Sequence, residues 1–279
     1  MNKQLGAVQA IAGWGHHHGL VPEDVPWSDP YSEMRLAEEQ SEREPFDARD
    51  LQTIFNAPLF TEHKLPMGAK GEAGTWLPLL ALFVGARQAE YAGLRVSDVR
   101  EDEETGVPLM WFMRDTKAGR RLKTKTSERV VPVHPQLAEL GFLEYVATRR
   151  TEGERAWLFP TVAPDQKGAL SAWSKWWGRY LRNHVVGIND RNKVYHSFRH
   201  GFQDALRRTT PDEELRDALT GRSSGKSVGR TYGAKEMLRR WGAQTLKRAV
   251  DDVSYPGLDL SRVRTSGLVK RTRGAKVTR

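Results

Sequence analysis

The 279-residue chain contains no cysteine, which excludes a disulfide framework, a cysteine nucleophile and cysteine-ligated zinc. It has no run of 18 or more apolar residues, and its first 20 residues lack the charged start, apolar middle and cleavage site of a signal peptide. These absences favour a cytoplasmic protein without a membrane anchor. With 38% hydrophobic residues and nine tryptophans, the chain can still bury a substantial core.

Charge is unevenly spread along the chain, whose formal net charge is +9. Acidic residues outnumber basic ones by six in residues 1–50, whereas residues 51–259 carry a basic excess of eight. After residue 259 there are seven basic residues and no acid. The body of the protein is therefore basic, which is compatible with a nucleic-acid partner but does not by itself indicate one.

Composition divides the chain into three parts. A helix predicted over residues 5–20 is followed by a proline-rich acidic linker, so we expect residues 1–45 to lie outside the main domain. The main domain is predicted over residues 46–255, where Asp47 is placed to cap the first helix. Residues 256–279 are predicted to be a basic irregular tail.

The main domain is predicted to be α+β, mostly helical with one small three-stranded antiparallel sheet. Short segments rich in valine, tryptophan and phenylalanine or in alternating charge indicate strands at residues 107–114, 120–126 and 129–134. Helical periodicity is expected over residues 48–60, 75–85, 135–150, 170–185, 196–209, 211–219 and 234–250.

The predicted helix over residues 196–209 has two distinct faces. At 100° per residue its apolar residues share one face, made by Phe198, Phe202, Ala205 and Leu206. His196 and Arg199 lie about 60° apart on a neighbouring face. The pair suits a phosphate, because a guanidinium offers a planar fork of donors and an imidazole exchanges a proton near neutral pH. A solvated helix edge is the alternative.

Two further segments present cations. Arg87 follows Gly85, which is expected to end an apolar helix, and a chain reversal of this kind commonly presents a charged group into a cleft. Glu90 is placed to orient Arg87 or to form a surface pair with it. On the predicted hairpin, Lys123 and Lys125 point outward, either towards a phosphate or a leaving oxygen or only as edge charges.

Tyr232 ends a loop rich in glycine and serine that begins after residue 220. A phenol is a weak nucleophile at neutral pH and needs cations that stabilise its oxyanion. Arg87, Arg199 and Arg222 are candidates to supply them. A tyrosine that packs by its ring and leaves its hydroxyl in water is the alternative.

Taken together and in this order, the four segments resemble the tyrosine recombinase or phage integrase family. The resemblance rests on G-A-R-x-x-E-Y-x-x-L around Arg87, K-T-x-x-S-x-R-x-V-P-V-H from Lys123, H-S-F-R-H from His196, and the G-R-S-S-G loop before Tyr232. It covers about residues 47–250. The first 45 residues resemble the last helix and linker of the family's amino-terminal DNA-clamping domain, most of which we expect to be absent.

The resemblance implies an enzyme that breaks and rejoins DNA through a 3′-phosphotyrosine intermediate, in integration or excision of a mobile element. It implies Arg87 and Arg199 as phosphate clamps, Lys123 as general acid to the leaving 5′ oxygen, His196 as a proton-handling donor and Glu90 as an orienting partner. Tyr232 is the implied nucleophile, and Lys125 replaces Lys123 if the hairpin alignment slips by two residues. No metal or other cofactor is implied.

Arg222 departs from the family pattern, which usually has histidine there and sometimes tryptophan. Arginine can donate a hydrogen bond to the scissile phosphate but can scarcely accept a proton. Proton handling would then fall to His196 or to water, or the enzyme would be weakened.

The partners implied are double-stranded DNA, three further copies of the chain in a tetramer on DNA, and an accessory DNA-bending protein. Within the cytoplasm, the DNA-bound protein is expected at the bacterial nucleoid. Beyond the active site we expect DNA contacts from two basic segments, the hairpin and the helix around residues 174–182, through Lys125, Arg129, Lys175, Arg179 and Arg182. The tryptophans beside the second segment are expected in the core.

Three alternatives remain open from the sequence. A type IB topoisomerase-like enzyme would use similar chemistry to relax DNA. A non-catalytic DNA-binding protein with the same fold would bind DNA with a steep salt dependence and form no covalent adduct. A metal site at residues 16–18 is disfavoured, because three adjacent histidines on a helix point in different directions.

The packing of the last predicted helix also has two alternatives. Residues 234–250 would pack either on a neighbouring subunit or on their own chain.

Overall fold

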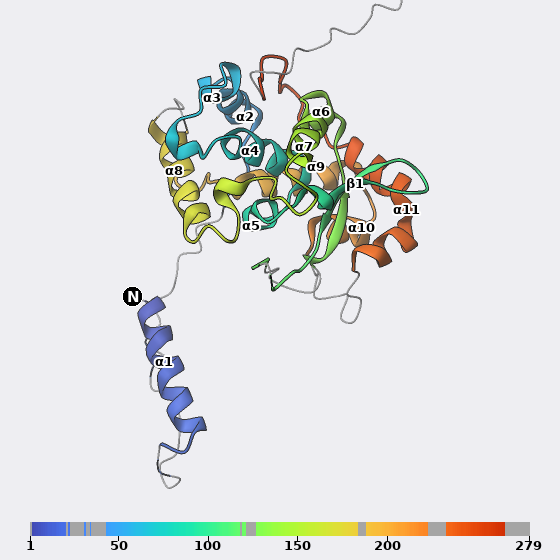
Figure 1. Cartoon of the computed structure of the whole chain (residues 1–279). Coiled ribbons are helices and arrows are strands. Elements are labelled where there is room, and N and C mark those ends of the chain that lie inside the picture. Colours follow the sequence, from blue (N-terminus) through green and yellow to red (C-terminus); the bar gives the residue numbers. More distant parts are fainter. Residues whose placement is uncertain are drawn as a thin grey trace, which may run out of the picture. The chain divides into compact units, whose positions relative to one another are not determined.

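The computed structural model of the chain, drawn in Figure 1, describes residues 2–20, 22, 31, 34, 43–117, 119–120, 127–183, 188–222 and 233–265. It divides into two units, residues 1–42 and residues 43–279. The first unit contains α1 (Asn2–His17), which confirms the predicted helix and has no buried residue. Among the described residues, no helix is long and apolar enough to span a membrane.

The second unit begins with the predicted cap. The side chain of Asp47 accepts a hydrogen bond from the backbone N–H of Asp50 at 2.8 Å, and Asp50 accepts one from the N–H of Asp47 at 3.1 Å. This reciprocal capping box starts α2 (Ala48–Phe55). The helix ends at Phe55, three residues before Pro58, which begins the separate short helix α3 (Pro58–Thr61), so the single helix expected over residues 48–60 is wrong.

The apolar helix α4 (Ala73–Val84) is buried along its whole length and lies in the middle of the unit in Figure 1. It ends at Gly85, as expected, with a left-handed φ of 62°. A Cβ atom at Gly85 would lie 2.1 Å from the ring of Phe202, so both the backbone conformation and the close packing require glycine there. The turn that leads to Arg87 is thereby fixed against the core.

The three-stranded antiparallel sheet has the order β1 (Val99–Glu101), β2 (Pro108–Phe112), β3 (Arg129–Pro132). Its existence confirms the α+β prediction, but its composition differs. β2 is the central strand and pairs with β1 on one side and with β3 on the other. The strand β1 lies before the three predicted strand segments in the sequence. Residues 121–126, where the sequence predicts a strand, lie outside the described residues.

Apart from the short helix that follows Arg87, which was not predicted, the remaining described helices follow the predicted segments closely. The expected helix over residues 135–150 is divided by Gly141, which has a φ of 90°. The helices are α5 (Gln88–Ala92), α6 (Pro135–Glu139), α7 (Phe142–Arg150), α8 (Ala169–Asn183), α9 (Ser197–Thr209), α10 (Glu213–Thr220) and α11 (Ala234–Asp251). Short 3-10 turns occur at Met67–Ala69, Val96–Asp98 and Pro160–Val162.

Helices α4 and α9 pack against each other, and α11 packs on β3. The predicted core face of α9 is confirmed, since Phe198, Phe202, Ala205 and Leu206 are each at most 1% exposed. Trp173 and Trp177 of α8 are fully buried, also as expected. Because α9 packs on α4, the neighbouring face of α9, which carries Arg199, lies against the turn at Gly85.

Residues 234–265 pack on their own chain. Helix α11 bends at Gly242, whose φ of 69° and ψ of 154° are not helical, and it buries Met237 before the bend and Leu246 after it. The described part of the tail has no helix or strand, yet Val263 is buried and the N–H of Arg264 donates to the carbonyl of Phe60 at 2.6 Å. The start of the tail therefore belongs to the core.

Candidate active site

Arg199 lies on α9 beside the core face and is only 4% exposed. Its Nη1 donates to the carbonyl of Gly85 at 2.5 Å, and its Nη2 donates to the carbonyl of Thr220 at 2.7 Å. These carbonyls stand two residues before Arg87 and Arg222. One buried guanidinium therefore joins three segments that are separated in sequence and that each carry a predicted site residue.

Burial, together with the neighbouring guanidinium groups of Arg129 and Arg87, lowers the pKa of Arg199 to about 10. Arg199 therefore remains charged at neutral pH. Its bond to Thr220 also caps the end of α10, where unsatisfied carbonyl groups favour a cation. The charge of Arg199 is thus held by backbone dipoles.

Arg87 stands at the start of α5 and is held by a carboxylate. Its Nη1 donates to Oε1 of Glu90 at 3.0 Å and to Oγ of Ser127 at 3.2 Å, and its backbone N–H donates to Oε2 of Glu90 at 2.9 Å. The Arg87 side chain keeps 29% of its surface exposed, whereas that of Glu90 keeps 3%. The predicted orienting partner thus lies inside, and Arg87 reaches the surface.

The same carboxylate also meets Arg129, whose Nη2 lies 2.8 Å from Oε2 of Glu90. Burial would raise the pKa of Glu90, but the charge of Arg129 and the backbone N–H of Arg87 outweigh it and leave the pKa below its ordinary value. Glu90 is therefore an ionised carboxylate that two arginines share.

Arg129 is fully buried, which is at odds with its predicted direct contact to DNA. Its Nε donates to the carbonyl of Leu219 at 3.0 Å, its Nη1 donates to the carbonyl of Ser127 at 2.8 Å, and its guanidinium stacks 4.5 Å from the ring of Phe112. A Cβ atom at residue 221 would lie 3.0 Å from Nη1, so Gly221 fits closely over it. The positive charge of Arg129 is evident from the sequence, but its position inside the protein is not.

His196 caps the start of α9 one turn before His200, and the two rings make an edge contact with centroids 5.1 Å apart. His196 itself is exposed, although its neighbours Tyr195 and Ser197 are buried. Partial desolvation and the nearby cationic groups of Arg199 and Arg87, together with His200, lower the pKa of His196 to about 4. The ring is consequently neutral at physiological pH and can accept a proton.

Arg222 is exposed at the rim of this region. Its Nη1 donates to Oε1 of Gln203 at 3.4 Å, and its backbone N–H donates to the carbonyl of Asp217 at 3.0 Å. A pocket of about 250 Å³ adjoins it, between the second half of α9 and one face of α10. The Arg222 guanidinium is therefore placed beside α9, on the same side as Arg199.

The structure thus gathers five of the predicted catalytic and orienting residues, Arg87, Glu90, His196, Arg199 and Arg222. The other three residues predicted near the reaction, Lys123, Lys125 and Tyr232, lie outside the described residues.

The cations predicted on α8 differ from this cluster in their surroundings. Lys175 and Arg179 are exposed, one turn apart, and Arg182 is half-buried with its Nη1 donating to the carbonyl of Gly178 at 2.7 Å. Their aromatic neighbours face the interior. Lys175 and Arg179 are therefore available for solvent or for a ligand.

Two contributors to the site were missed from the sequence. Tyr91, which directly follows Glu90, accepts the backbone N–H of Ala86 and donates to the carbonyl of Leu80 at 3.2 Å, so it closes the turn before Arg87. Ser127 joins the side chain of Arg87 to Arg129. Both residues stand within the quoted motifs, which was the available signal.

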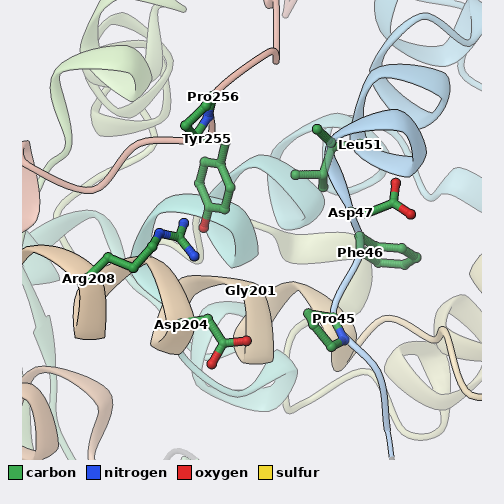
Figure 2. A pocket seen from close by; sticks show the side chains of 10 residues that line it. Pro45, Phe46, Asp47, Leu51, Gly201, Asp204, Arg208, Tyr255 and Pro256 are labelled. Carbon is green, nitrogen blue, oxygen red and sulfur yellow. The ribbon is translucent and has the colours of Figure 1, made fainter.

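A second pocket, of about 180 Å³, lies on a different face of α9 (Figure 2). Gly201, Asp204 and Arg208 line it from α9, and Tyr255 and Leu51 come from other segments. At 100° per residue these α9 positions lie about 140–200° from Arg199. This pocket is therefore not part of the candidate site.

Within the described ranges, no cluster of three or more histidine, aspartate or glutamate residues is arranged to hold a metal ion. The ring of His18, just after α1, stacks on Trp14 of that helix at a centroid distance of 4.3 Å.

This arrangement can bind an oxyanion, because guanidinium groups stabilise charge on phosphate oxygens and a neutral imidazole can take up a proton. No family model, no curated protein and no solved structure matches the chain.

Proposed function

We propose that the chain is a site-specific DNA recombinase of the tyrosine type, which cuts and rejoins DNA through a covalent 3′-phosphotyrosine intermediate. The observation that supports this most directly is the pair of hydrogen bonds from Arg199 to the carbonyls of Gly85 and Thr220. They bring Arg87, Arg199 and Arg222 to one place, in agreement with the order of motifs in the sequence. The proposal is thus supported both by the order of the sequence motifs and by hydrogen bonds that join the segments carrying them.

In the proposed reaction, the phenolic oxygen of Tyr232 attacks a DNA phosphorus atom, and the bond from phosphorus to the 5′ oxygen breaks. Lys123 gives a proton to the leaving 5′ oxygen, with Lys125 as the alternative donor. The phenolic proton passes to His196 or to water. A 5′-hydroxyl later attacks the phosphotyrosine and reverses the step, so the bond energy is kept and no nucleotide cofactor is needed.

Arg87 and Arg199 are proposed to stabilise negative charge on the nonbridging oxygens during both steps. Preorganised donors are effective in this role because they need not reorient as charge develops. The shared carboxylate of Glu90 supports the role by fixing Arg87 without occupying the exposed part of its side chain.

The proposed partner is double-stranded DNA, on which four copies of the chain would assemble, with an accessory DNA-bending protein. The proposed location is the cytoplasm, at the nucleoid when the protein is bound to DNA. The proposed outcome is integration or excision of a mobile element.

Arg222 favours a second candidate, a DNA-binding protein of the same fold with weakened or no catalysis. Its guanidinium can hold a phosphate but cannot take over proton transfer from a histidine. Such a protein would bind DNA and fail to form a covalent adduct. Relaxation of supercoiled DNA without a target sequence would instead indicate a topoisomerase.

A substrate nicked close to the cleavage site separates these functions, because the released fragment diffuses away and traps the adduct. We expect the unmodified protein to form a covalent complex that Tyr232→Phe abolishes and Tyr180→Phe retains. The measurement is the shift of labelled DNA on a denaturing gel. An adduct that persists in Tyr232→Phe would contradict the proposed nucleophile, and DNA binding without any adduct would favour the second candidate.

A further inference from the structure

The buried guanidinium of Arg129 is bonded to several other parts of the protein, which a residue that only contacts DNA would not require. Its guanidinium contacts the Glu90 carboxylate, the carbonyls of Ser127 and Leu219, and the ring of Phe112. These partners come from the helix after Arg87, the segment before β3, the end of α10, and β2. A fully buried arginine is costly unless such partners satisfy it.

Exposure increases from Arg129 towards Arg87. The side chains of Arg129 and Glu90 are 0% and 3% exposed, and that of Arg87 is 29% exposed. Two routes join the buried arginine to the exposed one. The first passes through the two oxygens of Glu90, and the second passes through Ser127, whose carbonyl accepts from Arg129 and whose hydroxyl accepts from Arg87.

We infer that Arg129 is a positioning residue for the proposed phosphate clamp, and that it holds Arg87 in place through Glu90 and Ser127. The expected effect of Arg129 on catalysis rests on the proposed function. The immobilisation of Arg87 by Arg129 does not depend on that function.

The fork geometry of arginine is essential to this role. The three nitrogens of Arg129 bond three acceptors in different directions, and lysine presents one compact ammonium instead. Arg129→Lys therefore keeps the buried positive charge but loses part of the network. A displacement of about 1 Å in a positioned group can cost about 10² in rate.

Two readouts test the inference on the full chain. The first is the mobility of the Arg87 side chain in the free protein, measured by NMR relaxation at its Nε–H group. We expect Arg129→Lys and Ser127→Ala to increase this mobility. The control Arg149→Lys alters an arginine that also bonds a carboxylate and a carbonyl, those of Glu152 and Trp157, and should leave Arg87 unchanged.

The second readout is the rate of adduct formation at saturating DNA. We expect a loss of about 10² for Arg129→Lys, about tenfold for Ser127→Ala and less than about threefold for Arg149→Lys. DNA affinity should change little. In an Arg87→Ala background, Arg129→Lys should cost less than about threefold more, because a residue that acts through another adds nothing once the second is gone.

Equal losses from Arg129→Lys in the presence and absence of Arg87 would overturn the inference, and so would unchanged Arg87 mobility. If Arg129→Lys fails to fold, Phe112→Leu decides the question by both readouts, since it removes the ring that packs on the Arg129 guanidinium and leaves the direct partners of Arg87 in place. We expect it to increase the mobility of Arg87 and to slow adduct formation. If the unmodified protein forms no adduct, the proposed function fails, and the mobility of Arg87 still decides whether Arg129 positions it.

Discussion

Two groups of basic residues in this protein have contrasting environments, the bonded cluster of Arg87, Arg129 and Arg199 and the exposed pair of Lys175 and Arg179 on α8. In the bonded cluster, each guanidinium is held by carbonyl groups or by Glu90, in fixed directions. On α8 the cations face outward. The first environment suits stabilisation of charge at one point, and the second suits attraction to a charged polymer, whose strength depends on salt.

The largest effect is expected from Glu90→Ala. The substitution leaves Arg129 fully buried without its carboxylate, which should lower the free energy of unfolding by about 3–5 kcal/mol. Urea denaturation measures this change. The control Glu154→Ala breaks an exposed pair with Arg150 on α7 and should cost less than about 0.5 kcal/mol. Equal losses of unfolding free energy in the two variants would show that the buried and the exposed carboxylate contribute alike to stability.

The same carboxylate predicts sensitivity to acid. Because the folded pKa of Glu90 lies below its ordinary value of 4.5, its contribution to stability is fully present above pH 4.5. It is lost as the pH falls through the lower folded value. The acid-induced loss of stability should therefore be smaller in Glu90→Gln than in the unmodified protein.

A smaller effect, on binding alone, is expected when Lys175 and Arg179 are both changed to alanine. If each contacts a phosphate, the slope of log K against log salt should become shallower by about 2, since each contact contributes about 0.9. The adduct rate at saturating DNA should stay within about threefold. Arg150→Ala on α7 serves as the control, and a slope that is equally steep in the α8 variant would show that α8 lies away from DNA.

The smallest expected effect concerns His196. In the free protein its pKa is lowered to about 4, so the unfolded chain binds more protons between pH 4 and 6.5 and this group disfavours folding as the pH falls through that window. A bound phosphate favours the protonated ring, so DNA should raise the pKa. NMR titration measures the change, with the buried ring of His134, which bonds the carbonyl of Val253 at 2.9 Å, as the control. An unchanged titration of His196 on DNA would place it away from the phosphate.

Local patterns predicted the parts of the fold that depend on neighbours in sequence. The cap at Asp47, the apolar helix α4 and the two faces of α9 each follow from spacing within one segment. The strand β1 was missed because it has three residues and no alternation, and its pairing with β2 depends on the loop between them.

The position of Arg129 could not be predicted for a related reason. Its partners Glu90 and Leu219 lie 39 residues before it and 90 residues after it, and only the folded chain brings them together. For Arg87 and Arg199, the sequence proposed the residues as candidates but did not reveal that backbone carbonyls and a shared carboxylate hold them.

The most direct test of the central claim is the chemical identity of the bond between protein and DNA. Adduct from the nicked substrate can be trimmed with nuclease, digested and analysed by mass spectrometry. We expect a single nucleotide remnant linked through its 3′-phosphate to the peptide that contains Tyr232. A remnant on any other residue, or one linked through a 5′-phosphate, would contradict the account.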